Sequence, residues 1–212
     1  MSENTLPARI IEVASELFAK QGFEQTSMRQ IAKASRCTAP AIYLHFKDKE
    51  ALQFVVVQGA FERLSRALDE ATRFGPGALF RLQRLGWAYV EFGLEHPNHY
   101  QLMFMQRAHF LTQPLEAEPE PDASPHAASP TRMSAFDSLR RAVQDVAREE
   151  GSLLPDPELL RWCDTLWAGL HGVMALSIAM PGFDRGRTLG AAENFILSIT
   201  GQLQRHVLTR HM

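Results

Sequence analysis

Basic and hydroxyl side chains gather between residues 26 and 49, in types that suit contact with phosphate groups. This stretch reads TSMRQIAKASRCTAPAIYLHFKDK, and its charged residues are Arg29, Lys33, Arg36, Lys47 and Lys49 against the single acid Asp48. The whole chain carries a formal net charge of −2, so the positive charge is local. A local basic cluster is typical of a nucleic-acid-binding surface. Charge alone is also compatible with a small helical subdomain whose basic face meets water.

Two short helices must position these side chains. The first is predicted to start at Ser27, because a hydroxyl followed three positions later by Gln30 is the pattern of a capping box. The second is predicted to start at Thr38, with Pro40 in its first turn, where a missing backbone N–H costs nothing. Two short helices joined by a tight turn indicate a helix-turn-helix.

The residue order around the second helix resembles the TetR family of bacterial repressors. The segment TAPAIYLHFKDKEAL is similar to the family's recognition helix and the start of its next helix, and ASELFAKQGFEQTSMRQIA is similar to its first two helices. The matching positions in the first segment are Tyr43, His45, Phe46, Lys47, Lys49, Glu50 and Leu52. The chain departs at Arg36, where the family usually has a glycine. The resemblance implies a homodimeric repressor that binds palindromic double-stranded operator DNA and is released by a small-molecule effector.

The candidate DNA-binding residues fall into three groups. Hydroxyls, helix N-termini and lysines bind phosphates without reading sequence, and this role is expected for Ser27, Thr38, Tyr43, Lys47 and Lys49. Ala39, Pro40 and Ala41 offer no side-chain hydrogen bonds, so they are expected to contact thymine methyl groups. Arg29 matches a base-contacting position of the family and is expected to bind guanine, and His45 joins the set through its match to the family pattern.

The whole chain is predicted to be all-α, with about nine helices. Apolar residues recur at spacings of three and four, and no strand-like alternation persists. We expect a helix-turn-helix domain at residues 1–50 and a helical bundle for ligand binding and dimerisation at residues 51–212. The predicted helices that follow the helix-turn-helix cover residues 48–74, 78–95, 98–110, 133–150, 158–180 and 187–207. Residues 112–131, rich in proline and acids, are expected to form a flexible loop.

Aromatic and methionine side chains of the predicted bundle are candidates for an effector site, because adaptable methionines with aromatic rings suit an apolar or aromatic ligand. These residues are Trp87, Phe92, Tyr100, Met103, Phe104, Trp167, His171 and Met174. Trp167, His171 and the following glycine fit the W-x-x-x-H-G pattern of one TetR C-terminal subgroup. Two alternatives stay open: the cluster is partly core, and His171 is a core histidine bonded to a backbone carbonyl.

The last two predicted helices are apolar on more than one face and must be covered on two sides. This pattern indicates a four-helix dimer interface to which each subunit contributes two helices. The candidate interface residues are Leu170, Val173, Phe195, Ile199 and Leu203.

Composition and motifs argue against other classes. No apolar run of about eighteen residues could span a membrane, and no basic-then-apolar leader is present, so a cytoplasmic location is expected. The thiols of Cys37 and Cys163 are expected to be reduced. His96, His99 and His109 lack the cysteine or carboxylate pair that would complete a tetrahedral metal site.

No enzyme and no cofactor is predicted, because the chain lacks a glycine-rich phosphate loop, a Ser-x-x-Lys motif and a nucleophile elbow. The alternatives to a DNA-binding regulator are a helical protein-binding adaptor and a small-molecule-binding protein whose head does not bind specific DNA.

Overall fold

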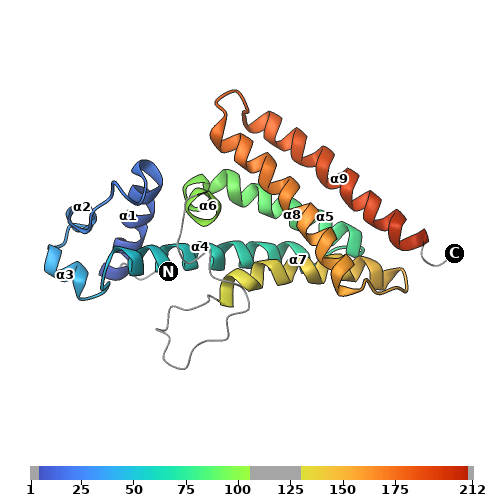
Figure 1. Ribbon diagram of the computed structural model, residues 1–212, viewed down its shortest axis with the longest axis horizontal. Helices are drawn as coiled ribbons and strands as arrows, with labels where there is room; N and C mark the ends of the chain where they lie inside the picture. The colour runs from blue at the N-terminus through green and yellow to red at the C-terminus, as the bar shows by residue number, and fades with distance from the viewer. Residues whose placement is uncertain (1–4, 106–129, 210–212) are drawn as a thin grey trace. The chain divides into compact units, whose positions relative to one another are not determined.

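The computed structural model describes residues 5–105 and 130–209, which fold into helices without a strand in those ranges (Figure 1). The helices are α1 (Leu6–Gln21), α2 (Met28–Ala34), α3 (Ala39–Tyr43), α4 (Lys49–Thr72), α5 (Ala78–Glu95), α6 (Pro97–Phe104), α7 (Pro130–Glu149), α8 (Asp156–Ala179) and α9 (Arg185–Thr209). The prediction of an all-α protein is therefore confirmed. Among the described residues, no helix is both long and apolar enough to cross a membrane.

The chain divides into two compact units, and each is described by itself. Of the described residues, the first unit contains 5–61, 98–105 and 130–131, and the second contains 62–97 and 132–209. The division falls inside α4, between Phe61 and Glu62, and the predicted domain boundary at residue 50 stays a prediction. The assignment of ligand binding and dimerisation to residues 51–212 stays a prediction.

The first unit owes its shape to α1, which gives the two short helices a core. Thr5 caps the N-terminus of α1, and Gly22 ends it with a φ of 85°, in the left-handed region that glycine tolerates. Ile10 and Phe18 of α1 are fully buried. The fully buried side chains that come from the next helices of this unit are Ile31, Ile42 and Leu52.

The second unit is built on close contact between α5, α8 and α9, with α8 and α9 side by side and antiparallel (Figure 1). Glycines permit this approach: a Cβ atom added to Gly93 of α5 would lie 2.6 Å from the Met174 side chain of α8, and one added to Gly169 would lie 2.0 Å from the Phe195 ring of α9. On another side, α7 runs along the C-terminal half of α4, where the Ser65 and Ser134 hydroxyls are 2.8 Å apart.

Most predicted helix bounds differ from the observed ones by a few residues. The helix predicted over residues 48–74 is α4, and it ends before the turn formed by residues 75–77. α7 begins at Pro130, three residues before the predicted start, because proline is compatible with the first helical turn. The predicted loop at 112–131 lies outside the described residues except for its last two positions, which are helical.

Candidate nucleic-acid interface

The start of α2 is fixed by the predicted capping box. The Gln30 backbone N–H donates to Ser27 Oγ over 3.3 Å, and the Ser27 backbone N–H donates to Gln30 Oε1 over 2.7 Å. These two bonds satisfy donors that a helix N-terminus leaves without partners. α2 is then held on the core by Met28, Ile31 and Ala32, which are buried. The remaining face of α2 leaves Arg29 and Lys33 exposed.

The turn after α2 closes in a Schellman motif. The Arg36 N–H donates to the Lys33 carbonyl over 3.1 Å, and the Cys37 N–H donates to the Ala32 carbonyl over 2.9 Å. Arg36 occupies the left-handed position of this motif, with a φ of 53°. A left-handed conformation costs an L-residue about 1–2 kcal/mol. Arg9 of α1 braces the same turn, because its Nε donates to the Ser35 carbonyl over 2.9 Å.

α3 is a short helix with one buried anchor and an exposed surface. Thr38 is its N-cap and accepts a hydrogen bond from the Ala41 N–H over 3.3 Å. Ile42 is fully buried and holds the helix against the core. Tyr43 is 52% exposed, and Leu44, the C-cap residue, is 84% exposed. The helix therefore presents large side chains to the outside and not to the protein.

The predicted DNA-binding residues do not all share this exposure. The exposed ones are Ser27, Arg29, Thr38, Pro40, Tyr43, His45 and Lys47, whereas Ala39 and Lys49 are half-buried. The Lys49 ammonium has partners inside the first unit: it donates to the Phe23 carbonyl over 2.9 Å and lies 4.1 Å from the centroid of the Phe23 ring. Lys49 thus ties the start of α4 to the segment after α1, and its expected phosphate contact stays a prediction.

Leu44 is a residue that sequence reasoning did not assign. A leucine so exposed on the surface of α3 has no packing role in the described structure, since the burial of α3 is carried by Ile42. The sequence did contain a signal for the exposure of Leu44. Leu44 is two positions after the buried Ile42, and side chains two positions apart on a helix do not share a face.

Two family models match the chain. "Bacterial regulatory proteins, tetR family" matches residues 10–54, and "Tetracyclin repressor-like, C-terminal domain" matches residues 82–196, more than half of the chain. The first segment includes all of α2 and α3 with their caps and the start of α4.

The chain belongs to the TetR family.

Individual relatives agree with this assignment. The regulator AcrR of Shigella flexneri is 54% identical over 43 residues, which are 20% of this chain and 20% of the relative. The repressor KstR2 of Mycobacterium tuberculosis is 26% identical over 172 residues, or 79% of this chain and 81% of the relative. A tetR-family regulatory protein from Rhodococcus RHA1 has the same fold, with a TM-score of 0.70, 19% identity, and coverage of 94% of this chain and 97% of that chain. The chain spans about a fifth of the length of the first curated relatives it matches.

As a TetR-family protein with a DNA-binding helix-turn-helix, the chain groups with transcriptional regulators and not with enzymes. The C-terminal match does not distinguish the narrower W-x-x-x-H-G subgroup, which stays a prediction. Within the described residues, no three His, Cys, Asp or Glu side chains could hold a metal ion together. His99 instead pairs with Ser15 of α1, Nε2 to Oγ 2.9 Å, and His109 lies outside the described residues.

The residues predicted to bind an effector are divided between the two units of this TetR-family protein. In the first unit, Tyr100 and Met103 are fully buried, and the Phe104 ring lies 4.9 Å from Tyr100 and 5.5 Å from Phe61, centroid to centroid. This cluster packs as core. The expected role of Tyr100, Met103 and Phe104 in ligand binding stays a prediction.

In the second unit, Phe92 and Met174 are buried and Trp87 is half-buried. The Trp167 and His171 rings lie together as the four-residue spacing predicts, with centroids 6.1 Å apart. Trp167 is 42% exposed, and burial lowers the pKa of the half-buried His171, which favours a neutral imidazole. None of the residues predicted to bind an effector lines the groove of about 450 Å³ that the second unit forms. That groove is bordered by charged residues of α4, α5 and α7, Arg81 and Arg141 among them.

The residues predicted to form a dimer interface differ in their exposure within the protomer, and their role stays a prediction. Leu170, Ile199 and Leu203 are 4%, 8% and 0% exposed, because they pack inside the protomer between α5, α8 and α9. The other two predicted interface residues, Val173 and Phe195, are half-buried. The exposed large apolar side chains of the same two helices are Leu160, Trp167, Leu176, Leu197 and Leu208.

Proposed function

We propose that this protein is a homodimeric repressor that binds a palindromic operator through α2 and α3 and is released by a small apolar or aromatic effector. The observation that carries the proposal is the geometry of α3. Thr38 caps its start, buried Ile42 anchors it, and Tyr43 and Leu44 project from the protein. An exposed short helix held rigidly after a tight turn is what insertion into a major groove requires. The family membership supports the same function.

The contacts to DNA follow from side-chain chemistry. Ser27, Thr38, Tyr43 and Lys47 bind phosphates and set the register without reading sequence. Arg29, exposed on α2, donates two parallel hydrogen bonds to a guanine. Ala39, Pro40 and Ala41 approach thymine methyl groups, and Leu44 offers a larger apolar surface of the same kind. His45 lies beside this surface and is exposed.

Dimerisation places two recognition helices on one face of the duplex. Each α3 needs its own major groove, and the two grooves are separated by whole helical turns of about 34 Å. The exposed apolar side chains of α8 and α9, such as Trp167, Leu176 and Leu197, are the surface that a second copy covers. A dimer joined there holds its two helix-turn-helix regions at one fixed separation.

The effector acts on that separation. α4 is a continuous helix whose first half belongs to the unit of α1–α3 and whose second half belongs to the other unit. An effector bound among the aromatic and methionine side chains therefore shifts α4 and with it α3. A preference of a few kcal/mol for the DNA-incompetent state is enough to change operator occupancy. Bulky substitutions between Trp87 and Phe104 are expected to alter this response and to leave the dimer intact.

The test begins with purified protein and fragmented genomic DNA. Recovery and sequencing of the bound fragments should give a two-fold symmetric sequence, and a reporter carrying that sequence at its promoter should be silenced by the protein. KstR2 is a repressor and FasR of Mycolicibacterium smegmatis is an activator. Activation of the reporter would therefore make this protein an activator of transcription and would leave the proposal of DNA binding intact. Recovery of no enriched sequence would favour a protein-binding adaptor or a ligand-binding protein.

A further inference from the structure

The turn of the helix-turn-helix holds an arginine at a position that favours glycine. The Schellman motif after α2 requires a left-handed residue, and Arg36 adopts that conformation with a φ of 53°. Glycine reaches this region without a steric penalty. The chain uses glycine at two other helix ends, where Gly22 and Gly151 have φ values of 85° and 72°. The arginine therefore carries a conformational cost that a glycine would remove.

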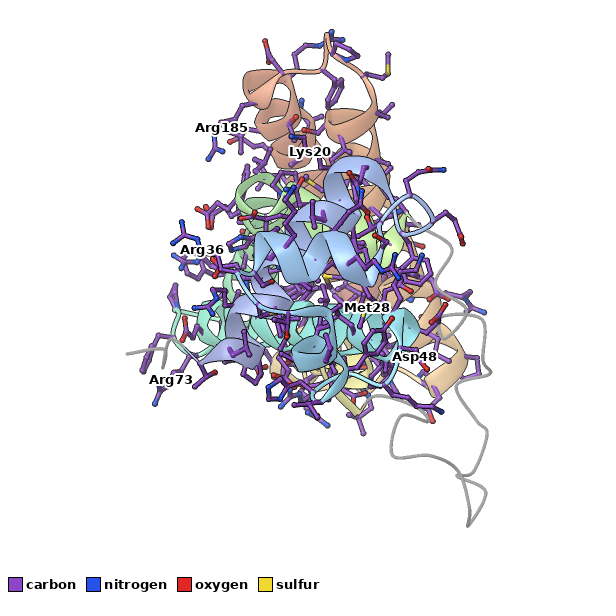
Figure 2. All side chains as sticks on the ribbon, turned by 90° about the vertical axis from the view of Figure 1, so that its left-hand side faces the viewer. Lys20, Met28, Arg36, Asp48, Arg73 and Arg185 are labelled. Carbon is purple, nitrogen blue, oxygen red and sulfur yellow. The ribbon has the colours of Figure 1, made fainter. Side chains whose placement is uncertain are left out.

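The Arg36 side chain itself makes no polar or ring contact with the described residues that would offset this cost. The Arg36 side chain is exposed and lies at the edge of the unit that contains α1–α3 (Figure 2). Within residues 5–105 and 130–209, its guanidinium has no hydrogen bond, ion pair or ring contact. The arginine that stabilises the turn is Arg9, through its bond to the Ser35 carbonyl. The strained backbone thus holds an exposed guanidinium that has no such partner among the described residues.

The location of Arg36 in the helix-turn-helix limits the kind of partner that its guanidinium meets. It lies two residues before Thr38, the N-cap of α3, and it follows the helix that exposes Arg29 and Lys33. About half or more of protein–DNA hydrogen bonds go to phosphate and sugar oxygens, and arginine is among their main donors. A guanidinium stays charged and binds phosphate oxygens in a bidentate manner.

We propose that Arg36 contacts a backbone phosphate beside the half-site that α3 reads, and that this contact is the reason the turn keeps an arginine in place of a glycine. The inference rests on the proposed function. It adds to the expected contacts a residue at which this chain departs from the family pattern.

The test compares the variants Arg36→Gly and Arg36→Asn with the wild-type protein. Binding is measured on the operator recovered from genomic DNA and on an unrelated duplex. Asparagine tolerates the left-handed conformation and carries no charge. The matched control is Arg185→Ala, which removes an exposed arginine from the start of α9 and changes the net charge equally. Anisotropy titrations at several salt concentrations give the affinity and its salt dependence, and thermal unfolding gives the stability.

We expect Arg36→Gly to unfold at a temperature no lower than the wild type and to bind both duplexes about tenfold more weakly. The slope of log K against log salt should fall by about 0.9 for each half-site. Arg36→Asn should lose the same affinity, and Arg185→Ala should bind as the wild type does.

Three results would overturn the inference and leave the proposed function standing. They are an unchanged affinity and salt slope for Arg36→Gly, a loss confined to the operator, which would indicate a base contact, and normal binding by Arg36→Asn. Failure of the wild type to prefer any duplex would remove the proposed function and this inference together.

Discussion

The contact between Gly169 of α8 and Phe195 of α9 makes a strong prediction about stability. A Cβ atom on Gly169 would lie 2.0, 2.4 and 2.6 Å from the Cζ, Cε2 and Cε1 atoms of the Phe195 ring. The ring would have to retreat by about 1.4 Å to reach the 3.4 Å at which ordinary contact begins. Because α8 and α9 are packed against each other along their length, the ring cannot move without separating the helices or leaving its rotamer.

Overpacking of this kind costs about 1–3 kcal/mol, whereas replacing a helical glycine by alanine normally stabilises by about 1 kcal/mol. The matched control is Gly190→Ala in α9, because an added Cβ there meets nothing within 4 Å. Because both glycines are helical, this gain applies to both variants, which should therefore differ by about 1–3 kcal/mol, or on the order of 2–12 °C in Tm. The assay is thermal unfolding followed by circular dichroism, with all proteins at one concentration because the proposed dimerisation would make Tm concentration-dependent.

Phe195→Leu in the Gly169→Ala background should restore part of the loss, and the two substitutions should show a coupling free energy above about 1 kcal/mol. Equal unfolding temperatures for Gly169→Ala and Gly190→Ala would refute the close approach of α8 and α9 at this point. Additive effects of the substitutions at Gly169 and Phe195 would show that these two residues do not contact each other.

Three other predictions address the interface, the dimer and pH. Arg29→Ala should cost about 1–3 kcal/mol of operator affinity and relax the preference at one base pair per half-site; in competition titrations, an equal loss on every sequence would make Arg29 a phosphate ligand. Leu197 is 51% exposed on α9 and lies on the surface proposed for the dimer, so Leu197→Asp should give monomers in sedimentation experiments and weak operator binding in titrations. Ile199→Asp should instead unfold the protomer, because it places a charge in the core. The pKa of Glu149 lies below its usual 4.5, first because it accepts a hydrogen bond from the Ala78 N–H over 2.7 Å and also because of the nearby Arg81, while burial acts in the opposite direction. A lowered folded-state pKa adds stability above the unfolded pKa that is lost as the pH falls through the folded pKa. Glu149→Gln keeps an acceptor for the Ala78 N–H and removes only the charge of a half-exposed carboxylate, so it should cost less than about 1 kcal/mol near pH 7, and the difference should vanish at the acid end; a variant with the wild-type Tm at pH 7 would contradict a stabilising role for this charge.

Local chemistry in the sequence was sufficient for the helix-turn-helix. The caps Ser27 and Thr38 and the first-turn Pro40 act through hydrogen bonds and backbone geometry within four residues, so their roles do not depend on the rest of the fold. The helical class likewise followed from apolar spacing, and the residue order from Tyr43 to Leu52 was enough to indicate the family. The consequence of Arg36 for the turn was left open, because a strained residue is recognised only from its φ angle.

The tertiary structure decided which faces of the helices are covered. α8 and α9 carry apolar residues on more than one face, so their periodicity could not separate Leu203, which is fully buried, from Leu197, which is half exposed. The choice depends on the position of α5, whose Gly86 and Gly93 let the other two helices approach closely. Lys49 shows the same limit: its charge suggested phosphate, and only the fold revealed that Phe23 already holds its ammonium group. Sequence specifies side chains and local hydrogen bonds, but the partners of a side chain distant in the chain are chosen by how the helices pack.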